Sequence, residues 1–396
     1  MKKFIYTWGL LLMSLMAWCR PHPLIVISLD GCRWDYPLWY DTPFLDYMGR
    51  YGVESGLIPA FPSKTFPNHY TLATGLSPDV HGIIANSFYD PLSGCTFSLG
   101  DSAQKFNPYY YGGEPIWLTA KKQGLRTAVF YWPGSDVMIG GHYPDRYYVF
   151  DDEPRLTMSQ RLDAIIEEIG KVDSERPDLI MAYLEQPDAS GHDFGPQSRE
   201  TRQAVINVDA MLGDFYMRLL SLPKGHQVNL IVLSDHGMTL VEPERRISLK
   251  DKLKSSWLIS SSGSIPENIY VAPGCVDSVF AALKDLDHVR VWKKGDVPDY
   301  LHYGKNPRIG DIVVLPDLGY IIYDTPFTSG GGQHGYDPYL SDMHAIFRAI
   351  GPDISNVALP HFRNIHVYSL LCHLLQIQPA SNESDGEATK AILKDP

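Results

Sequence analysis

Three mainly apolar runs, each followed closely by an aspartate, constrain the fold of this chain more than any other feature. The runs occupy residues 24–29, 179–184 and 228–233. Continuous β-branched and apolar residues of this length are typical of strands that are buried on both faces of a sheet. Asp30, Asp188 and Asp235 come at or just after the ends of these runs. Since the carboxyl ends of parallel strands gather ligand-binding groups, we expect the three carboxylates to meet at one edge of the sheet.

Helical and strand patterns alternate along most of the chain. Apolar spacing and proline positions predict helices at residues 115–122, 158–169, 199–220 and 365–375, and strands at residues 126–131 and 345–350. This alternation predicts an α/β fold with a central, mostly parallel sheet that is covered by helices on both faces. Residues 240–330 are less regular, and we interpret them as an insertion or small cap within a single domain of residues 23–380. We expect the polar tail, residues 381–396, to fray.

Residues 1–22 have the pattern of an export signal. Two lysines precede an apolar run, residues 4–18, that is too short to span a bilayer. Cys19 directly follows this run, so a lipid-modified cysteine is an alternative, although Trp18 fits poorly before such a cleavage site. We therefore expect export to the periplasm or the cell surface, with a lipid anchor at Cys19 left open. The sequence does not tell how Cys32, Cys95, Cys275 and Cys372 pair.

The net charge of −12 restricts the partners of the chain. An acidic protein is poorly suited to electrostatic binding of nucleic acid. An anionic small substrate would need local positive charge, such as bound metal ions, rather than a favourable overall field. The composition leaves the oligomeric state open.

Residues 62–69 place the hydroxyl of Thr65 just before an expected helix. Pro67 suits the first turn of a helix, where its missing N–H would have had no partner. A hydroxyl at this point faces unpaired backbone N–H groups and the positive end of the helix dipole, which is a good place to hold a phosphate. Taken alone, the segment favours a simpler interpretation, in which Thr65 is the N-cap of the helix.

Carboxylates and imidazoles recur together in the sequence. Asp188 and His192 stand one helical turn apart, on one face. Asp235 and His236 are adjacent after a strand, and His334 stands in a glycine-rich loop. Each pair alone is a weak signal, but three carboxylates and three imidazoles together form a ligand set that suits two zinc ions. Two Zn²⁺ against three aspartates would leave a small positive charge, which suits a phosphodiester.

Several motifs occur in a fixed order from residue 24 to about residue 379. They are Leu29-Asp30-Gly31, residues 62–69, His81-Gly82-Ile83-Ile84-Ala85-Asn86, Lys105-Phe106-Asn107-Pro108, Gly113-Glu114-Pro115-Ile116-Trp117, Trp132-Pro133-Gly134-Ser135-Asp136, Glu185-x-x-Asp188-x-x-x-His192, Ser234-Asp235-His236-Gly237-Met238 and His334-Gly335. With these motifs the chain resembles the nucleotide pyrophosphatase/phosphodiesterase family of the alkaline phosphatase superfamily. The resemblance implies an alkaline-phosphatase-like fold and suits a compact, exported enzyme of the bacterial type.

The resemblance also implies two zinc sites and a nucleophile. One zinc ion would be held by Asp188, His192 and His334. The other would be held by Asp30, Asp235, His236 and the hydroxyl of Thr65. Thr65 would be the nucleophile, since coordination to Zn²⁺ stabilises its alkoxide. Asn86 and the backbone N–H of Phe66 would donate to the phosphoryl oxygen.

A substrate pocket follows from the same resemblance. Its residues would be Phe66, Leu99, Lys105, Trp132, Phe150 and Tyr183. An aromatic slot stacks any base, and Lys105 would add a donor and a charge near the base edge. The position of Lys105 is less secure than that of the metal ligands because the loop after Leu99 is one residue longer than in the family. Without the resemblance, Trp132 and Phe150 would be interpreted as core residues, and Phe150 replaces a tyrosine that is common in nucleotide-selective members.

We therefore expect a zinc-dependent enzyme that hydrolyses phosphodiester and pyrophosphate bonds of nucleotides. It would release nucleoside 5′-monophosphates through a covalent threonine-phosphoryl intermediate. The nearest alternative is a phosphodiesterase of choline-containing lipid head groups. A phosphomonoesterase is less favoured because the neutral Asn86 would not match a dianion. A non-catalytic phosphoester-binding protein would lack a ligand or the nucleophile, and this chain has both.

Overall fold

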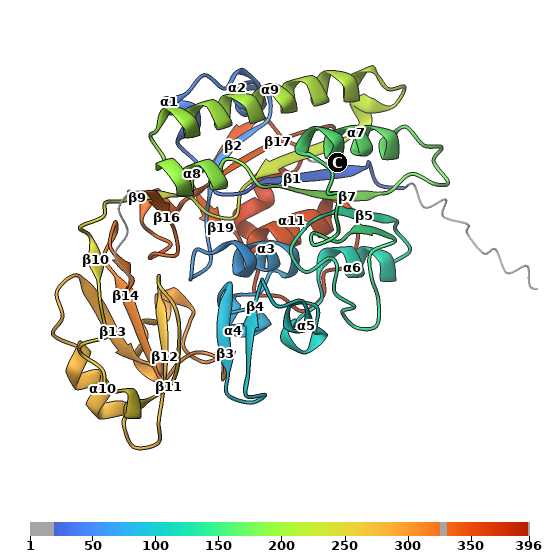
Figure 1. Cartoon of the computed structure of the whole chain (residues 1–396). Coiled ribbons are helices and arrows are strands. Elements are labelled where there is room, and N and C mark those ends of the chain that lie inside the picture. Colours follow the sequence, from blue (N-terminus) through green and yellow to red (C-terminus); the bar gives the residue numbers. More distant parts are fainter. Residues whose placement is uncertain (1–19, 325–330, 395–396) are drawn as a thin grey trace, which may run out of the picture.

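The computed structural model describes residues 20–324 and 331–394, and one large sheet forms its centre (Figure 1). Nine strands of the described residues take part, in the order β18-β2-β17-β8-β1-β7-β5-β6, with β19 also beside β2. Their bounds are β1 Leu24–Leu29, β2 Val53–Ile58, β5 Thr127–Phe130, β6 Arg146–Tyr148, β7 Leu179–Leu184, β8 Asn229–Leu233, β17 Ala345–Ile350, β18 Val357–Ala358 and β19 Phe362–Arg363.

The central strands of this sheet are parallel and in register. β1 pairs in parallel with β7 on one side and with β8 on the other, so Leu24 lies beside both Leu179 and Asn229. Strand β17 runs antiparallel to both β8 and β2. The prediction of a mostly parallel sheet is confirmed. The register also brings the carboxyl ends of β1, β7 and β8 to the same edge.

Helices cover both faces of the sheet, as predicted (Figure 1). One face carries α2 (Pro43–Tyr51), α7 (Met158–Ile169) and α9 (Arg199–Ser221), and the other carries α3 (Thr65–Thr74), α6 (Ile116–Lys122) and α11 (His366–Leu374). Alternate residues of β1 pack against the helices on opposite faces of the sheet, because successive side chains of a strand point to opposite faces. Leu24 and Val26 pack with α3, α6 and α11, whereas Ile25 and Ile27 pack with α2, α7 and α9.

The N-cap interpretation of Thr65 is wrong. Thr65 is the first residue of α3, and Lys64 takes the N-cap position without a side-chain capping hydrogen bond. The Thr65 hydroxyl is therefore not occupied in holding the start of its own helix. The helix ends at Thr74, where Gly75 adopts a left-handed conformation with φ of 67° that favours glycine.

A smaller lobe lies within the range that we interpret as an insertion (Figure 1, lower left). Its antiparallel sheet has the order β11-β12-β14-β13. The bounds are β11 Leu258–Gly263, β12 Glu267–Val271, β13 Val289–Lys293 and β14 Ile312–Pro316, and helix α10 spans Val276–Leu283. Val279 and Leu283 of the helix and Ile312 and Val314 of the sheet belong to a separate apolar cluster. Its role as a cap stays a prediction.

The expected fraying of the tail is wrong for residues 381–394. A 3-10 turn at Glu387–Ile392 buries Thr389 and Ile392. The N–H of Glu383 donates to the Gly75 carbonyl at 2.8 Å. These contacts fix the tail against the end of helix α3. The polar composition of the tail therefore did not indicate that this segment packs against the domain.

The expectations for the amino terminus concern residues outside the described ranges. The export signal, apart from its last three residues, and a lipid anchor at Cys19 both fall there. Within the described ranges, no helix has the length and apolar character that crossing a membrane requires. The four described cysteines are free thiols; they are Cys32, Cys95, Cys275 and Cys372.

Candidate active site

The three strand-end aspartates meet at one edge of the sheet. Asp30 follows β1, Asp235 follows β8, and Asp188 begins helix α8 (Asp188–Phe194) beyond β7. The N–H of Asp188 donates to the Asp30 carbonyl at 2.9 Å, and the N–H of Gly31 donates to Asp235 Oδ1 at 3.2 Å. Gly31 has φ of 65°, and a Cβ there would lie 2.7 Å from Asp188 Oδ1. Only glycine lets the backbone turn this close to the carboxylate.

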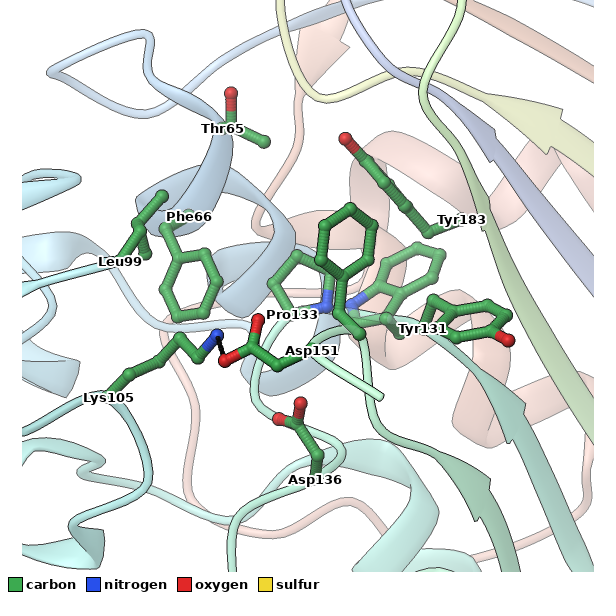
Figure 2. A pocket seen from close by; sticks show the side chains of 11 residues that line it. Thr65, Phe66, Leu99, Lys105, Tyr131, Pro133, Asp136, Asp151 and Tyr183 are labelled. Carbon is green, nitrogen blue, oxygen red and sulfur yellow. Dashed lines mark hydrogen bonds and ion pairs between the residues drawn. The ribbon is translucent and has the colours of Figure 1, made fainter. Parts of the chain in front are cut away.

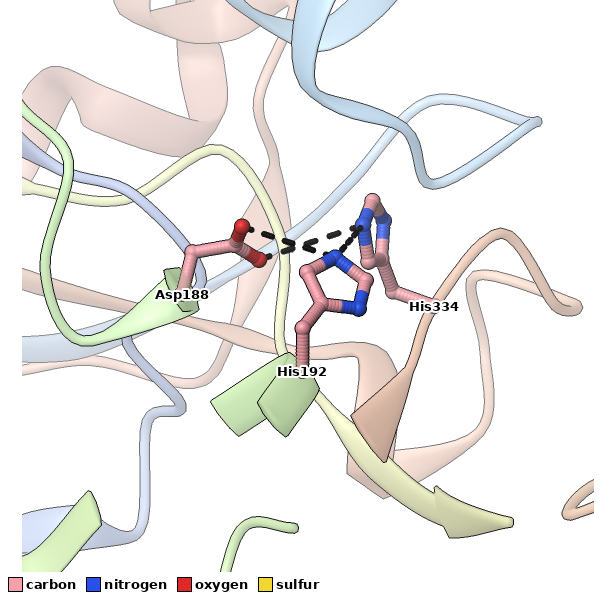
Figure 3. A group of neighbouring side chains, drawn as sticks. All are labelled: Asp188, His192 and His334. Carbon is pink, nitrogen blue, oxygen red and sulfur yellow. Dashed lines mark hydrogen bonds and ion pairs between the residues drawn. The ribbon is translucent and has the colours of Figure 1, made fainter. Parts of the chain in front are cut away.

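Asp188, His192 and His334 form one compact group (Figure 3). Helix α8 presents Asp188 and His192 one turn apart, and His334 comes directly after strand β16 (Gly331–Gln333). Asp188 Oδ2 lies 3.5 Å from His192 Nε2, and Asp188 Oδ1 lies 3.9 Å from His334 Nε2. The strand approaches α8 so closely that a Cβ on Gly331 would lie 2.2 Å from the His192 carbonyl oxygen. The glycine-rich sequence before His334 makes this approach feasible.

Asp30, Asp188 and His236 form a second group, whose ligand atoms lie within 4.8 Å of one another. His236 Nε2 lies 3.5 Å from Asp30 Oδ1 and 3.0 Å from Asp235 Oδ2. The ring of His236 stacks on that of His334 at 3.6 Å between centroids, which brings the two groups together. Asp188 belongs to both groups. Asp235 lies beside the second group rather than within it.

The histidine rings are oriented as metal ligands are. The Nδ1–H groups of His192 and His334 donate to the carbonyls of Gly332 and Ser63, each at 2.8 Å, since a carbonyl can only accept. The two Nε2 lone pairs then face each other at 3.1 Å. Burial and the nearby cationic side chains, first that of His236, hold the pKa of His334 well below its usual value. A proton between the rings is therefore disfavoured, and a metal cation would relieve the repulsion.

The carboxylates point to the same conclusion. Asp30 Oδ1, Asp188 Oδ1 and Asp235 Oδ2 are buried and accept no well-formed hydrogen bond. Burial, followed by the charges of Asp235 and Asp188, raises the pKa of Asp30 well above its usual value. Burial would also raise the pKa of Asp235, but the positive charges of His236 and His69 lower it. Unpaired buried oxygens are costly. A mixed set of nitrogen and oxygen ligands fits divalent zinc.

Thr65 lies at the border of the second group. Its Oγ1 is 3.2 Å from His236 Nε2. The His236 Nδ1–H donates to the Gly237 carbonyl at 2.9 Å, so its Nε2 is the atom turned toward the hydroxyl. The two predicted phosphate donors are adjacent: the N–H of Phe66 donates to Asn86 Oδ1 at 2.9 Å. The structure therefore brings the hydroxyl, the metal-ligand candidates and the donors to one place.

His69 is a residue of this site that the sequence analysis missed. It is fully buried, with Nδ1 2.9 Å from the Thr65 carbonyl oxygen and 3.4 Å from Asp235 Oδ2. Its Nε2 lies 2.8 Å from Ser28 Oγ, on strand β1. The only signal in the sequence is its spacing of four residues from Thr65 on a helix. The ring connects the first turn of α3 to a carboxylate of the metal-ligand cluster.

A cavity of about 170 Å³ extends from Thr65 (Figure 2). All the predicted pocket residues line it, namely Phe66, Leu99, Lys105, Trp132, Phe150 and Tyr183. The sequence analysis missed Tyr131, Pro133, Asp136 and Asp151, which also line it. Tyr183 links the cavity to the aspartates because its hydroxyl donates to Asp30 Oδ2 at 2.6 Å. Trp132 has a structural role too, since its Nε1–H donates to the His69 carbonyl at 3.0 Å.

Known proteins with similar sequences and structures identify the family of this chain. A sequence model of the type I phosphodiesterase/nucleotide pyrophosphatase family matches residues 24–337. The chain belongs to this family. Among curated relatives, it is 36% identical over 390 residues to bovine ectonucleotide pyrophosphatase/phosphodiesterase family member 3 and 36% identical over 392 residues to human family member 1. It is 34% identical over 390 residues to venom phosphodiesterase 2 of Crotalus adamanteus.

Each of these alignments covers 94% of the chain, but only 44%, 42% and 48% of the respective relatives. The chain thus spans less than half the length of these family members. Among solved structures, human ectonucleotide pyrophosphatase/phosphodiesterase 5 superimposes with a TM-score of 0.88 at 34% identity, over 94% of this chain and 100% of that one. The predicted alkaline-phosphatase-like α/β fold is confirmed. The murine counterpart, at a TM-score of 0.87 and 33% identity, was solved in an inactive threonine-to-alanine form with AMP.

Proposed function

We propose that this protein hydrolyses phosphodiester and pyrophosphate bonds of nucleotides and releases nucleoside 5′-monophosphates. One observation carries the proposal. Thr65 stands beside the carboxylate–imidazole cluster and also lines the aromatic cavity. A nucleotide whose base lies in the cavity would have its phosphate at the Thr65 hydroxyl.

We propose that the side chains of the carboxylate–imidazole cluster, together with Thr65, bind two zinc ions. Asp188, His192 and His334 would hold one zinc ion, and Asp30, Asp235, His236 and Thr65 would hold the second. When bound, the two ions would favour the alkoxide of Thr65 and neutralise the charge on the leaving oxygen. The unpaired buried carboxylate oxygens and the facing Nε2 atoms support this assignment.

The chain's own groups would act in two displacements. In the first, the Thr65 hydroxyl loses its proton to solvent, Oγ1 bonds to phosphorus, and the bond from phosphorus to the leaving oxygen breaks. In the second, a water oxygen bonds to phosphorus, the bond to Oγ1 breaks, and Oγ1 regains a proton. The Phe66 N–H and the Asn86 side chain would bind a non-bridging phosphoryl oxygen, with the substrate oxygen replacing Asn86 Oδ1 at that N–H. Donors of this kind typically contribute about 10²–10³ in rate.

The relatives support a nucleotide as substrate. Several are named as nucleotide pyrophosphatases, and the inactive murine structure holds AMP. In this chain, Phe66, Trp132, Phe150 and Tyr183 supply aromatic surface for stacking a base. Several relatives are named ectonucleotide pyrophosphatases, and we propose export for this chain. A periplasmic location and a lipid anchor stay predictions.

A comparison of substrates tests the proposal. We expect the purified, zinc-supplied protein to have its highest kcat/KM with the p-nitrophenyl ester of thymidine 5′-monophosphate. p-Nitrophenylphosphorylcholine and p-nitrophenyl phosphate should both be poorer substrates. A clear preference for the choline ester would instead establish the lipid head-group alternative, and a preference for the monoester would contradict a diesterase altogether.

A further inference from the structure

One end of the cavity holds three charged side chains, at the side opposite Thr65 in the view of Figure 2. Lys105 is only 5% exposed, and its Nζ lies 2.5 Å from Asp151 Oδ2. The Ser102 hydroxyl donates to the same carboxylate oxygen at 3.3 Å. Asp136 also lines this end of the cavity. If the phosphate lies at Thr65, the edge of the base would face these groups.

These charges do not balance. The ammonium of Lys105 has a carboxylate partner in Asp151, while Asp136 adds a second carboxylate. Burial raises the pKa of Asp136 to about 6, so it is mostly ionised at neutral pH and above. One N–H of Lys105 is directed to Asp151, and two carboxylates offer oxygens. This end of the cavity therefore has one excess negative charge and more acceptors than donors.

We propose that Asp151 sets the base preference of the enzyme by holding the Lys105 ammonium, an inference that rests on the proposed function. A cavity edge rich in carboxylate oxygens accepts from an exocyclic amino group, such as those of adenine and cytosine. A keto oxygen at the same position, as in hypoxanthine or uracil, meets carboxylate oxygens, and the charge of the one ammonium there is already neutralised by Asp151. The Lys105 side chain is buried and that of Asp151 is 38% exposed, so selectivity here is the difference between a base edge that pairs with these charged groups and one that does not.

Replacing Asp151 by Asn isolates this effect. The substitution keeps the shape of the side chain, removes its charge, and leaves the Lys105 ammonium without its carboxylate. The positive charge of Lys105 is then no longer neutralised at Asp151, so this end of the cavity attracts a keto oxygen more strongly. The matched control is Asp152→Asn, which removes the same charge from the next residue, an exposed one that does not line the cavity.

The experiment compares substrate pairs that differ at the amino or keto position. For each variant, kcat/KM is measured with ATP against ITP and with CTP against UTP, with hydrolysis of bis(p-nitrophenyl) phosphate as the base-free reference. We expect the wild-type and Asp152→Asn proteins to favour the amino base about tenfold, the discrimination typical of one hydrogen bond to a charged group. In Asp151→Asn, we expect both ratios to fall to near one.

The outcomes separate this inference from the proposed function. If the wild-type protein cleaves nucleotides but has no amino preference, or if Asp151→Asn retains that preference, the inference is overturned while the proposed function stands. If the wild-type protein cleaves no diester, both fail. Should Asp151→Asn not fold, the wild-type ratios decide, because a preference for ITP and UTP would overturn the inference without any variant.

Discussion

The hydroxyl of Thr65 and the ring of His236 lie 3.2 Å apart, although 171 positions separate them in the sequence. Thr65 comes from the start of α3, on one face of the sheet, and His236 from the loop that leaves β8. Thr65 follows strand β2, and β17 pairs antiparallel with both β2 and β8, so β2 and β8 run in the same direction and their carboxyl ends lie at the same edge of the sheet. The sheet therefore determines which hydroxyl the carboxylate–imidazole cluster can act on.

The first prediction concerns the nucleophile. Thr65→Ala should lower kcat/KM for nucleotide esters by about 10³-fold or more, because no other group of the chain would take over the bond to phosphorus. Thr65→Ser keeps the hydroxyl and should retain measurable turnover. Circular dichroism and Tm should match the wild type in both variants, since Thr65 makes no capping bond. Full activity in Thr65→Ala would exclude the covalent mechanism.

The second prediction concerns His69 as a positioning residue. His69→Gln removes the ring that lies between the Thr65 carbonyl and Asp235. We expect kcat to fall about tenfold with little change in KM, because substrate binding in the cavity does not involve this ring. His81→Gln is the control, since it removes another fully buried ring, which contacts Thr71 Oγ1 at 3.0 Å. Equal losses of kcat in both variants would mean a general packing effect and would refute the specific role.

The third prediction concerns metal removal. Treatment with a chelator should abolish diesterase activity and lower the Tm, because the three neighbouring aspartates would then lack a cation to offset their charges. A ligand that binds only the folded state stabilises it by RT ln(1 + [L]/Kd), so the Tm should rise with added Zn²⁺. Thermal scans and activity assays across a zinc titration measure both effects. Unchanged activity after complete removal of metal, verified by elemental analysis, would refute the metal-dependent mechanism.

The sequence predicted those parts of the fold that hydrophobic pattern determines. The bounds predicted for α7, β7 and β17 are those of the structure, because unbroken or periodic apolar residues mark both ends. The docked tail was not predicted. Ile392 is the one strongly buried apolar residue of its turn, and its partners lie far away in the chain, as with the Ile392 carbonyl that accepts from the N–H of Ser355 at 2.7 Å.

The same distinction applies to the site. The aspartates could be predicted because each follows a strand whose end is fixed by its own residues. The missed residues act through contacts that no local pattern contains. Lys105 and Asp151 are 46 positions apart, and their ion pair depends on how two loops pack over the cavity. That Asp188 also lies near His236 depends on side-chain positions that the sequence does not show.

The last prediction concerns Glu267, a buried residue of the smaller lobe. Burial raises its pKa from 4.5 to about 7, although the Ser261 hydroxyl donates to its carboxylate. A raised folded-state pKa favours folding below the pKa of the unfolded chain, and this contribution is lost as the pH rises through about 7. Glu267→Gln cannot ionise, so it should be more stable than the wild type at pH 8 by about 2 kcal/mol and no more stable at pH 4.

Urea denaturation at the two pH values measures this difference in the free energy of unfolding. Glu244→Gln is the matched control, because Glu244 is exposed and its replacement should change stability little at either pH. The sign of the effect distinguishes two causes. If Glu267→Gln is less stable than the wild type at pH 8, the hydrogen bond from Ser261 outweighs the cost of burying the charge, and the carboxylate stabilises the lobe in its ionised form.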